Sequence, residues 1–271
     1  MAPTARSKID WAVVAAFPRE LGDLRRRTGA RRIQSDRFAW IVPREPSDCL
    51  LITTGIGAER AEERTRAIIR QHRPRRAIVC GFGGALDPAL RSGDVVLASE
   101  VIDVATHEVF HPSRELVAIA LEALRSSETR RGTLAVAPTI APDSESKRTI
   151  AQETSAACVD LESAGCARAL EDEGCPALFA RVIVDELDTR FPKGALELLD
   201  ANGRARPGAL ARLIAREPRS IASLVDLGKR SRRAAHALAT FVQTIIEGAS
   251  SPPAMPDTES PITPRPCDDE R

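Results

Sequence analysis

Short apolar runs alternate with polar stretches of helical spacing along most of this chain, and this pattern constrains the fold more than any other feature. The apolar runs lie at residues 10–16, 49–53, 77–80, 95–101, 134–137, 157–159 and 178–184. Helical spacing occurs over residues 58–72, 116–124 and 163–173. Strands that alternate with helices in this way are typical of a parallel sheet covered by helices on both faces. We expect an α/β protein with a single-domain three-layer α/β/α fold and a mixed, mostly parallel central sheet.

The same pattern sets the expected domain boundaries. It predicts one domain over residues 8–248, preceded by an N-terminal tail of residues 1–7. Residues 196–248 have mostly helical spacing, with breaks at Asn202-Gly203 and near Pro218. Residues 249–271 contain six prolines among serine, threonine and acidic residues. Such a segment cannot bury enough apolar surface to fold, so we expect a disordered tail.

The balance of charges argues against a polyanionic partner. The chain has 39 lysines and arginines against 38 aspartates and glutamates, which gives a formal net charge of +1. That value gives no electrostatic reason to expect nucleic acid or an anionic membrane surface. No apolar run approaches the roughly 18 residues that a membrane-spanning helix needs. We therefore expect a small-molecule partner, no nucleic acid and no membrane span.

The cysteines and histidines do not predict a metal site. The six cysteines form no C-x-x-C pair, and there are only four histidines. This argues against zinc. Arg6 and Lys8 precede the first apolar run, as in a signal peptide, but Asp10 and the charged residues after Pro18 favour a buried first strand. We expect a reducing cytoplasm as the compartment, with no metal and no cofactor.

Carboxylates and glycines follow several of the predicted strands. Ligands of α/β sheets bind beyond the carboxyl ends of the strands. Glu20, Glu162 and Asp185 all lie there, as do the turns 55–57 and 81–84. A single carboxylate at such a place is more often a helix cap, and a single glycine turn is more often structural. Three carboxylates from distant parts of the chain instead favour a site for acid–base chemistry.

Four segments in order resemble the superfamily of purine nucleoside phosphorylases and nucleosidases, which includes methylthioadenosine/S-adenosylhomocysteine nucleosidase. They are VVAAFPREL, LLITTGIGAERAEERTRAII, AIVCGFGGALDPALRSGDVVLASEVID and VDLESAGCARALEDEGCPALFARVIVD. Together they span about residues 10–190, and the run from Gly84 to Asp94 followed by V-D-L-E-S is specific in combination. The resemblance implies a phosphorylase-like fold. A later segment, from Asp185 to Pro218, more weakly resembles a hopanoid-associated subgroup that acts on adenosylhopane.

The resemblance implies roles for the three carboxylates. Glu20 matches the glutamate that positions the attacking water in the nucleosidases, and Glu162 matches the one that binds ribose hydroxyls, with Leu161 where methionine is usual. Asp185 matches the aspartate that donates a proton to N7 of the leaving purine. Glu20 and Asp185 are therefore the expected catalytic residues. The residues expected to contact the substrate are Glu162, Leu161, Asp160, Gly83, Gly84, Phe82 and Thr139. The residues expected to bind phosphate are Arg19 and Gly57.

Several positions depart from the family pattern. Val184 replaces the serine that normally orients the aspartate, and Phe82 replaces a small residue beside the nucleophile. Val79 stands where hexameric phosphorylases carry a phosphate-binding arginine, although Arg19 could supply one. Residues 136–140 lack the phenylalanine that stacks on adenine, which leaves the preferred base open.

The sequence leaves alternatives for the activity. The leading interpretation is cleavage of an N-ribosyl bond through an oxocarbenium-like transition state, by phosphorolysis with inorganic phosphate or by hydrolysis. Arg19 and the late segment favour phosphorolysis. A nucleoside-binding protein without catalysis is the second interpretation, while an acyl or phosphoryl hydrolase lacks a supporting G-x-S-x-G motif. By resemblance we also expect a homo-oligomer, with residues 58–69 as a contact unless their apolar side chains face the sheet.

Overall fold

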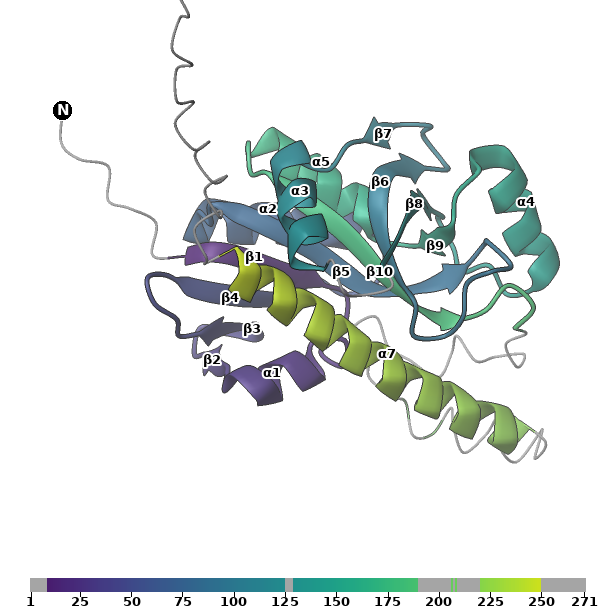
Figure 1. Cartoon of the computed structure of the whole chain (residues 1–271), viewed down its shortest axis with the longest axis horizontal. Helices are drawn as coiled ribbons and strands as arrows, with labels where there is room; N and C mark the ends of the chain where they lie inside the picture. The colour runs from purple at the N-terminus through teal and green to yellow at the C-terminus, as the bar shows by residue number, and fades with distance from the viewer. Residues whose placement is uncertain (1–8, 125–128, 190–205, 207, 209–219, 250–271) are drawn as a thin grey trace, which may run out of the picture.

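The computed structural model describes residues 9–124, 129–189, 206, 208 and 220–249 (Figure 1). The expected tails at residues 1–7 and 249–271 lie almost wholly outside these ranges, as do the breaks expected at Asn202-Gly203 and Pro218. The strands are β1 (Ile9–Ala15), β2 (Arg31–Ile33), β3 (Asp36–Val42), β4 (Asp48–Thr53), β5 (Arg76–Ala85), β6 (Val95–Asp103), β7 (Val109–Phe110), β8 (Thr129–Val136), β9 (Cys158–Asp160) and β10 (Ala177–Asp185). The helices are α1 (Gly22–Thr28), α2 (Ala58–His72), α3 (Arg114–Ala123), α4 (Ser144–Thr154), α5 (Ser163–Asp172) and α7 (Ser220–Gly248).

One ten-stranded mixed sheet forms the middle layer. Nine strands follow the order β10-β6-β8-β9-β5-β1-β4-β3-β2, the tenth strand, β7, pairs with β6, and β10 also pairs with β5. The central pairs β1–β4, β1–β5 and β5–β10 are parallel. Because β1, β5 and β10 run in the same direction, the residues that follow or end them meet at one edge of the sheet. The expected three-layer arrangement with a mixed sheet is confirmed.

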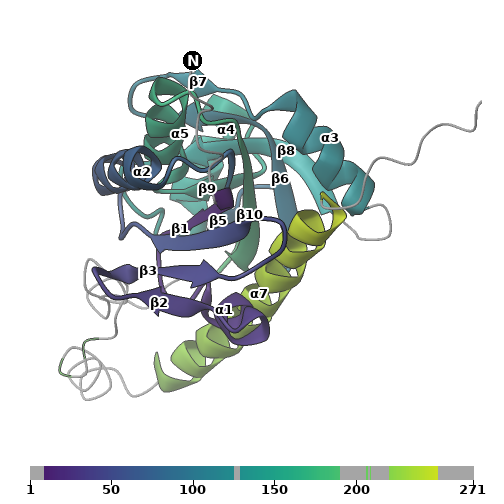
Figure 2. The same ribbon diagram turned by 90° about the vertical axis from the view of Figure 1, so that its left-hand side faces the viewer.

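Helices cover both faces of the sheet (Figures 1 and 2). Helices α2 and α5 pack on one face around a core that includes Ile68, Val79 and Leu170. Helices α1, α3 and α7 pack on the other face, around a core that includes Leu24 and Val242. Within the described residues, no helix is long and apolar enough to cross a lipid bilayer.

The apolar side chains of α2 face inwards. Ala61, Thr65, Ile68 and Ile69 recur at helical spacing and are all buried within the single chain. They pack against the sheet and α5. The apolar stripe considered as a contact between subunits is therefore occupied by the chain's own core.

One expectation about local structure is wrong, and one hairpin was not expected. Residues 81–84 are not a turn but the last part of β5, which extends to Ala85 and pairs with both β10 and β9. The four residues are held in the sheet because these two neighbours supply backbone partners as far as Gly84. The second difference is the hairpin of β2 and β3, which adds antiparallel strands at the edge beside β4 and has no counterpart in the expected pattern. Its outer strand is mostly exposed, so its sequence lacks a continuous apolar run.

Candidate active site

The Glu20 side chain returns to the sheet edge just after β1. Its Oε2 accepts a hydrogen bond from the Phe17 backbone N–H at 2.7 Å, and its Oε1 accepts one from the Phe82 N–H at 2.6 Å. The residue is 2% exposed. Burial raises the pKa of the Glu20 carboxyl, while the Arg181 charge and the backbone N–H groups lower it. The first loop and β5 thus fix this carboxyl group at the end of the sheet.

Arg181, in the middle of β10, lies at the centre of the buried polar cluster. Its Nε donates to Asp160 Oδ2 at 2.8 Å, and its Nη2 donates to Ser163 Oγ at 2.8 Å. Its Nη1 is buried and has no hydrogen-bond partner among the described residues. A methyl group on Gly81 would collide with this nitrogen and lie 2.6 Å from Glu20 Oε1. The absence of a side chain at Gly81 therefore lets the guanidinium group and the Glu20 carboxyl group both approach the backbone of β5.

Glu162 immediately precedes α5, but its side chain does not cap the helix. Asp160 has that role, because its Oδ1 accepts from the backbone N–H groups of Glu162 at 2.7 Å and Ser163 at 2.8 Å. The Glu162 side chain instead points across to α2, where its Oε1 accepts from the Gly57 N–H at 3.1 Å. Gly57 has a φ of 96°, a conformation that favours glycine.

The electrostatics of Glu162 follow from its surroundings. Burial, together with the nearby charges of Asp160 and Glu20, raises the pKa of its carboxyl group to about 8. The Arg181 charge and the Gly57 N–H oppose this shift. Glu20, Asp160 and Glu162 therefore surround one guanidinium, and the cluster has more carboxyl groups than positive charges.

Asp185 ends β10 at a bulge. The register with β5 shifts between Ile183 and Asp185, so Asp185 pairs with Gly84. Its Oδ2 lies 2.6 Å from the Nζ of Lys147 on α4. Burial raises the pKa of the Asp185 carboxyl, and the Lys147 ammonium lowers it. The end of β10 thus holds a carboxyl group whose proton affinity depends on two opposing effects.

The other expected site residues divide into three groups. Gly83 and Gly84 adjoin the cluster, because methyl groups there would lie 3.1 Å from Arg181 Cβ and 2.9 Å from Asp185 Oδ2. Phe82 and Leu161 are partly buried in apolar cores.

Thr139 and Arg19 lie outside the cluster. Thr139 is exposed. Arg19 is exposed as well, and its Nη2 donates to the Gly228 carbonyl of α7 at 3.4 Å.

Sequence reasoning missed two charged residues of the site. Arg181 interrupts the apolar run of β10, and a charge inside a strand buried on both faces requires a buried partner. That signal could have linked it to one of the carboxylates. Lys147 had no such signal, because the segment of α4 is polar nearly throughout.

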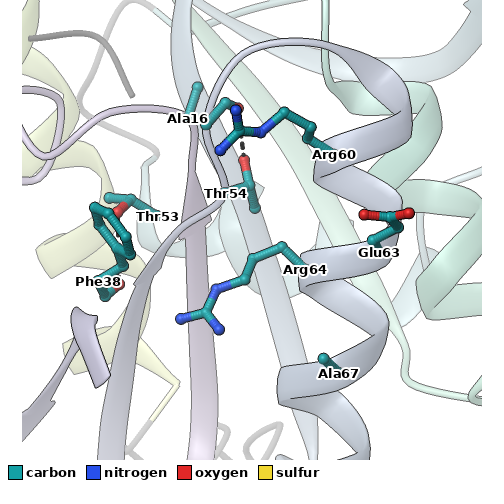
Figure 3. Close-up of a pocket in the computed structure, with 9 residues that line it drawn as sticks. Ala16, Phe38, Thr53, Thr54, Arg60, Glu63, Arg64 and Ala67 are labelled. Carbon is teal, nitrogen blue, oxygen red and sulfur yellow. Dashed lines mark hydrogen bonds between the residues drawn. The ribbon is translucent and has the colours of Figure 1, made fainter. Parts of the chain in front are cut away.

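A separate open cavity of about 410 Å³ lies between β3 and α2 (Figure 3). Arg60 and Arg64 of α2 face Phe38 and Thr53 across it. Arg64 forms an ion pair with Asp36. None of the three carboxylates Glu20, Glu162 and Asp185 lines this cavity, so it is distinct from the buried cluster.

Comparisons with known proteins agree with this architecture. A family profile described as the phosphorylase superfamily matches residues 10–216. Native futalosine hydrolase of Helicobacter pylori superposes with a TM-score of 0.70 at 15% identity, covering 90% of this chain and 99% of that one. The Neisseria meningitidis 5′-methylthioadenosine/S-adenosylhomocysteine nucleosidase in complex with methylthio-immucillin-A gives 0.68 at 20% identity, covering 88% and 98%. The Campylobacter jejuni nucleosidase of the same name gives 0.68 at 16% identity, covering 88% and 99%.

Proposed function

The chain belongs to the phosphorylase superfamily, and from this premise we propose that it hydrolyses the N-ribosyl bond of a purine nucleoside. The observation that carries the proposal is the cluster of three buried carboxyl groups, Glu20, Asp160 and Glu162, around the single guanidinium of Arg181. Breaking an N-ribosyl bond develops positive charge on the sugar. The carboxyl groups of this cluster stabilise such a charge in their ionised form.

Each carboxyl group has a separate task in this proposal. Glu162, held by the Gly57 N–H, accepts hydrogen bonds from ribose hydroxyls. A water molecule beside Glu20 attacks the anomeric carbon, and its proton passes to Glu20. The bond to the base breaks with its electron pair going to the base, and Asp185 supplies the proton that the base takes up. Burial favours the protonated form of Asp185 that this step requires.

Two observations favour water over phosphate as the nucleophile. A phosphate dianion beside Glu20 would lie close to several carboxyl groups, and those that are ionised would repel it. The expected phosphate ligands are also engaged elsewhere: Arg19 donates to Gly228 on α7, and the Gly57 N–H donates to Glu162. Phosphorolysis therefore becomes the second candidate, supported by the family's phosphorylases and by the anion-binding capacity of the Arg181 Nη1.

The test measures free base released from purine nucleosides, 5′-thioadenosines and an adenosylhopane-like lipid, with and without phosphate. We expect release without phosphate from at least one compound. Glu20→Gln and Asp185→Asn should each lower kcat by roughly 10²–10⁴-fold, the usual contribution of a general base or acid.

Matched controls come from exposed residues of the same types. Asp188, whose side chain is 77% exposed, should tolerate replacement by asparagine without loss of activity. Glu63 is exposed and lines the separate cavity, so Glu63→Gln should also be neutral. A strict requirement for phosphate would replace hydrolysis by phosphorolysis. Binding of a nucleoside with no release of base would favour a binding protein on this fold.

A further inference from the structure

Helix α4 makes an unusual contact with the end of β10. Lys147 is the buried residue of this helix, at 1% exposure. Lysine is almost never fully buried unless its charge is paired. Here the Nζ lies 2.6 Å from Asp185 Oδ2 and donates to the Glu186 carbonyl oxygen at 2.7 Å. One side chain thus joins the helix to two consecutive residues at the end of the strand.

Stability alone is a poor explanation for this contact. A buried ion pair loses the hydration of both charges, and well-packed apolar side chains of similar volume are often equally or more stabilising. Helix α4 also has its own anchors, because Asp143 caps it and Ile150 and Ala151 pack on an apolar cluster. The lysine is therefore better explained by what it does to Asp185.

We infer that Lys147 is a positioning residue for Asp185, which fixes one oxygen of the carboxyl group and stabilises the negative charge left when Asp185 releases its proton to the leaving base. This inference rests on the proposed function. With Oδ2 held by the ammonium group, Oδ1 is the oxygen that we expect to face a substrate. Val184, the residue before Asp185, is apolar and packs in the core that contains α7, so it offers no hydroxyl for the same purpose.

Other charges near Asp185 are arranged differently. Arg230 of α7 acts on it electrostatically, but this side chain is committed to Asp226 and Glu186. The Cys158 thiol of β9 is buried nearby, and burial raises its pKa, so it stays neutral. Lys147 is thus the cation in direct contact with the Asp185 carboxyl group among the described residues.

The expected behaviour of a Lys147→Met variant follows from the loss of this cation. The pKa of Asp185 rises further, so the carboxyl becomes a weaker acid and stays protonated to higher pH. We expect kcat to fall by about 10–100-fold and KM to change by less than about threefold. The alkaline limb of the kcat–pH profile should move upwards by about one unit or more, the usual effect of removing an opposite charge at this distance. Lys147→Arg, which keeps the charge, should recover part of kcat and the position of the limb.

Two comparisons separate this role from a structural one. Arg148 is the next residue on α4 and forms an exposed pair with Asp188, so Arg148→Met should change neither kcat nor its pH profile. In an Asp185→Asn background, Lys147→Met should lower kcat by less than about twofold further. The reason is that substitutions of residues that act as a unit do not have additive effects. An unshifted alkaline limb, or an equal loss in both backgrounds, would overturn the inference.

A readout without turnover distinguishes failure of this inference from failure of the proposed reaction. The ¹³C signal of the Asp185 carboxyl carbon, assigned by its absence in Asp185→Asn, can be titrated in the wild type and in Lys147→Met. A higher titration midpoint in the variant supports the contact even if no nucleoside is cleaved. If no nucleoside is cleaved, the positioning role of Lys147 in base release fails together with the proposed reaction. Equal titration midpoints in the two proteins would refute the effect of Lys147 on the Asp185 carboxyl group itself.

Discussion

The contact between α2 and α5 depends on the absence of a side chain at Gly165. A methyl group built there would overlap the Ala58 carbonyl oxygen and lie 2.7 Å from the carbonyl carbon. These are backbone atoms at the start of α2, so no side-chain rotation can relieve the overlap. The Gly165→Ala substitution must push the two helices apart.

The magnitude combines two opposing effects. Overpacking a buried contact costs typically 1–3 kcal/mol, and the rigidity of the Ala58 backbone places this case near the upper value of about 3 kcal/mol. Alanine gains about 1 kcal/mol over glycine from its helix propensity. We therefore expect a net loss of about 2 kcal/mol in the free energy of unfolding, or a drop of roughly 4–8 °C in Tm.

Gly228 in α7 provides a control with the opposite sign. It is also a helical glycine, but nothing lies within 4 Å of its hypothetical Cβ. Gly228→Ala should therefore stabilise the protein by about 0.5–1 kcal/mol.

Urea unfolding measures both substitutions. The buried Trp11 and Trp40 provide the fluorescence signal. A Gly165→Ala protein as stable as the wild type would refute the close contact between the helices. Equal changes for both glycines would show that helix propensity alone is being measured. Because Glu162 immediately precedes α5 and contacts Gly57 at the start of α2, the Gly165 variant should also lose activity.

Three further predictions concern the site. If Glu162 acts as a carboxylate, kcat/KM of the free enzyme should rise with pH through about 8. The free energy of unfolding should fall as pH rises from about 4.5 to about 8, because the folded chain holds the Glu162 proton more tightly than the unfolded chain does. A flat kcat/KM profile across this range would contradict the assignment. Gly84→Ala places a methyl group 2.9 Å from Asp185 Oδ2, so kcat should fall about tenfold or more. The free energy of unfolding measured in urea should change little. Unchanged turnover would show that the Asp185 carboxyl group can move freely. Asp143→Ala removes the cap of α4 and should lower the free energy of unfolding measured in urea by about 1 kcal/mol. Asp143→Asn should retain most of the wild-type stability, because asparagine can also cap a helix.

The sequence was sufficient to predict the layers of this fold because its central strands are continuous apolar runs. β1, β4 and β10 are buried on both faces, and such strands are visible without knowledge of their neighbours. The edge hairpin of β2 and β3 was not predicted: β2 is short and mostly exposed, and the apolar run at residues 38–42 of β3 was not interpreted as a strand. The glycines at residues 81–84 resemble a turn in the sequence, but pairing with β9 and β10 holds these residues in a strand.

The carboxylates of the site could be located from their positions after strands, but their partners could not. The positions of Glu20 and Glu162 follow from the ends of β1 and β9. Their contacts depend on Arg181 and Gly57, which lie far away in the chain and meet them only in the folded sheet. Lys147 is the extreme case, because its burial results from the placement of α4 against β10 and not from any property of its own segment.

The strand β10 carries groups from both ends of the proposed reaction. Arg181 lies on the side of the nucleophile, and Asp185, four residues later, lies on the side of the leaving base. A strand rises about 3.3 Å per residue, so the Cα atoms of these two residues are about 13 Å apart along the strand, less what the bulge takes up. β5 pairs with the strand as far as Asp185, and β6 pairs with it as far as Val182. The distance is set by covalent geometry and cannot adapt to the substrate. β10 therefore fixes the separation between the residue that acts near the sugar and the residue that acts on the base. Adding or removing one residue between Arg181 and Asp185 should abolish turnover even in a protein that still folds.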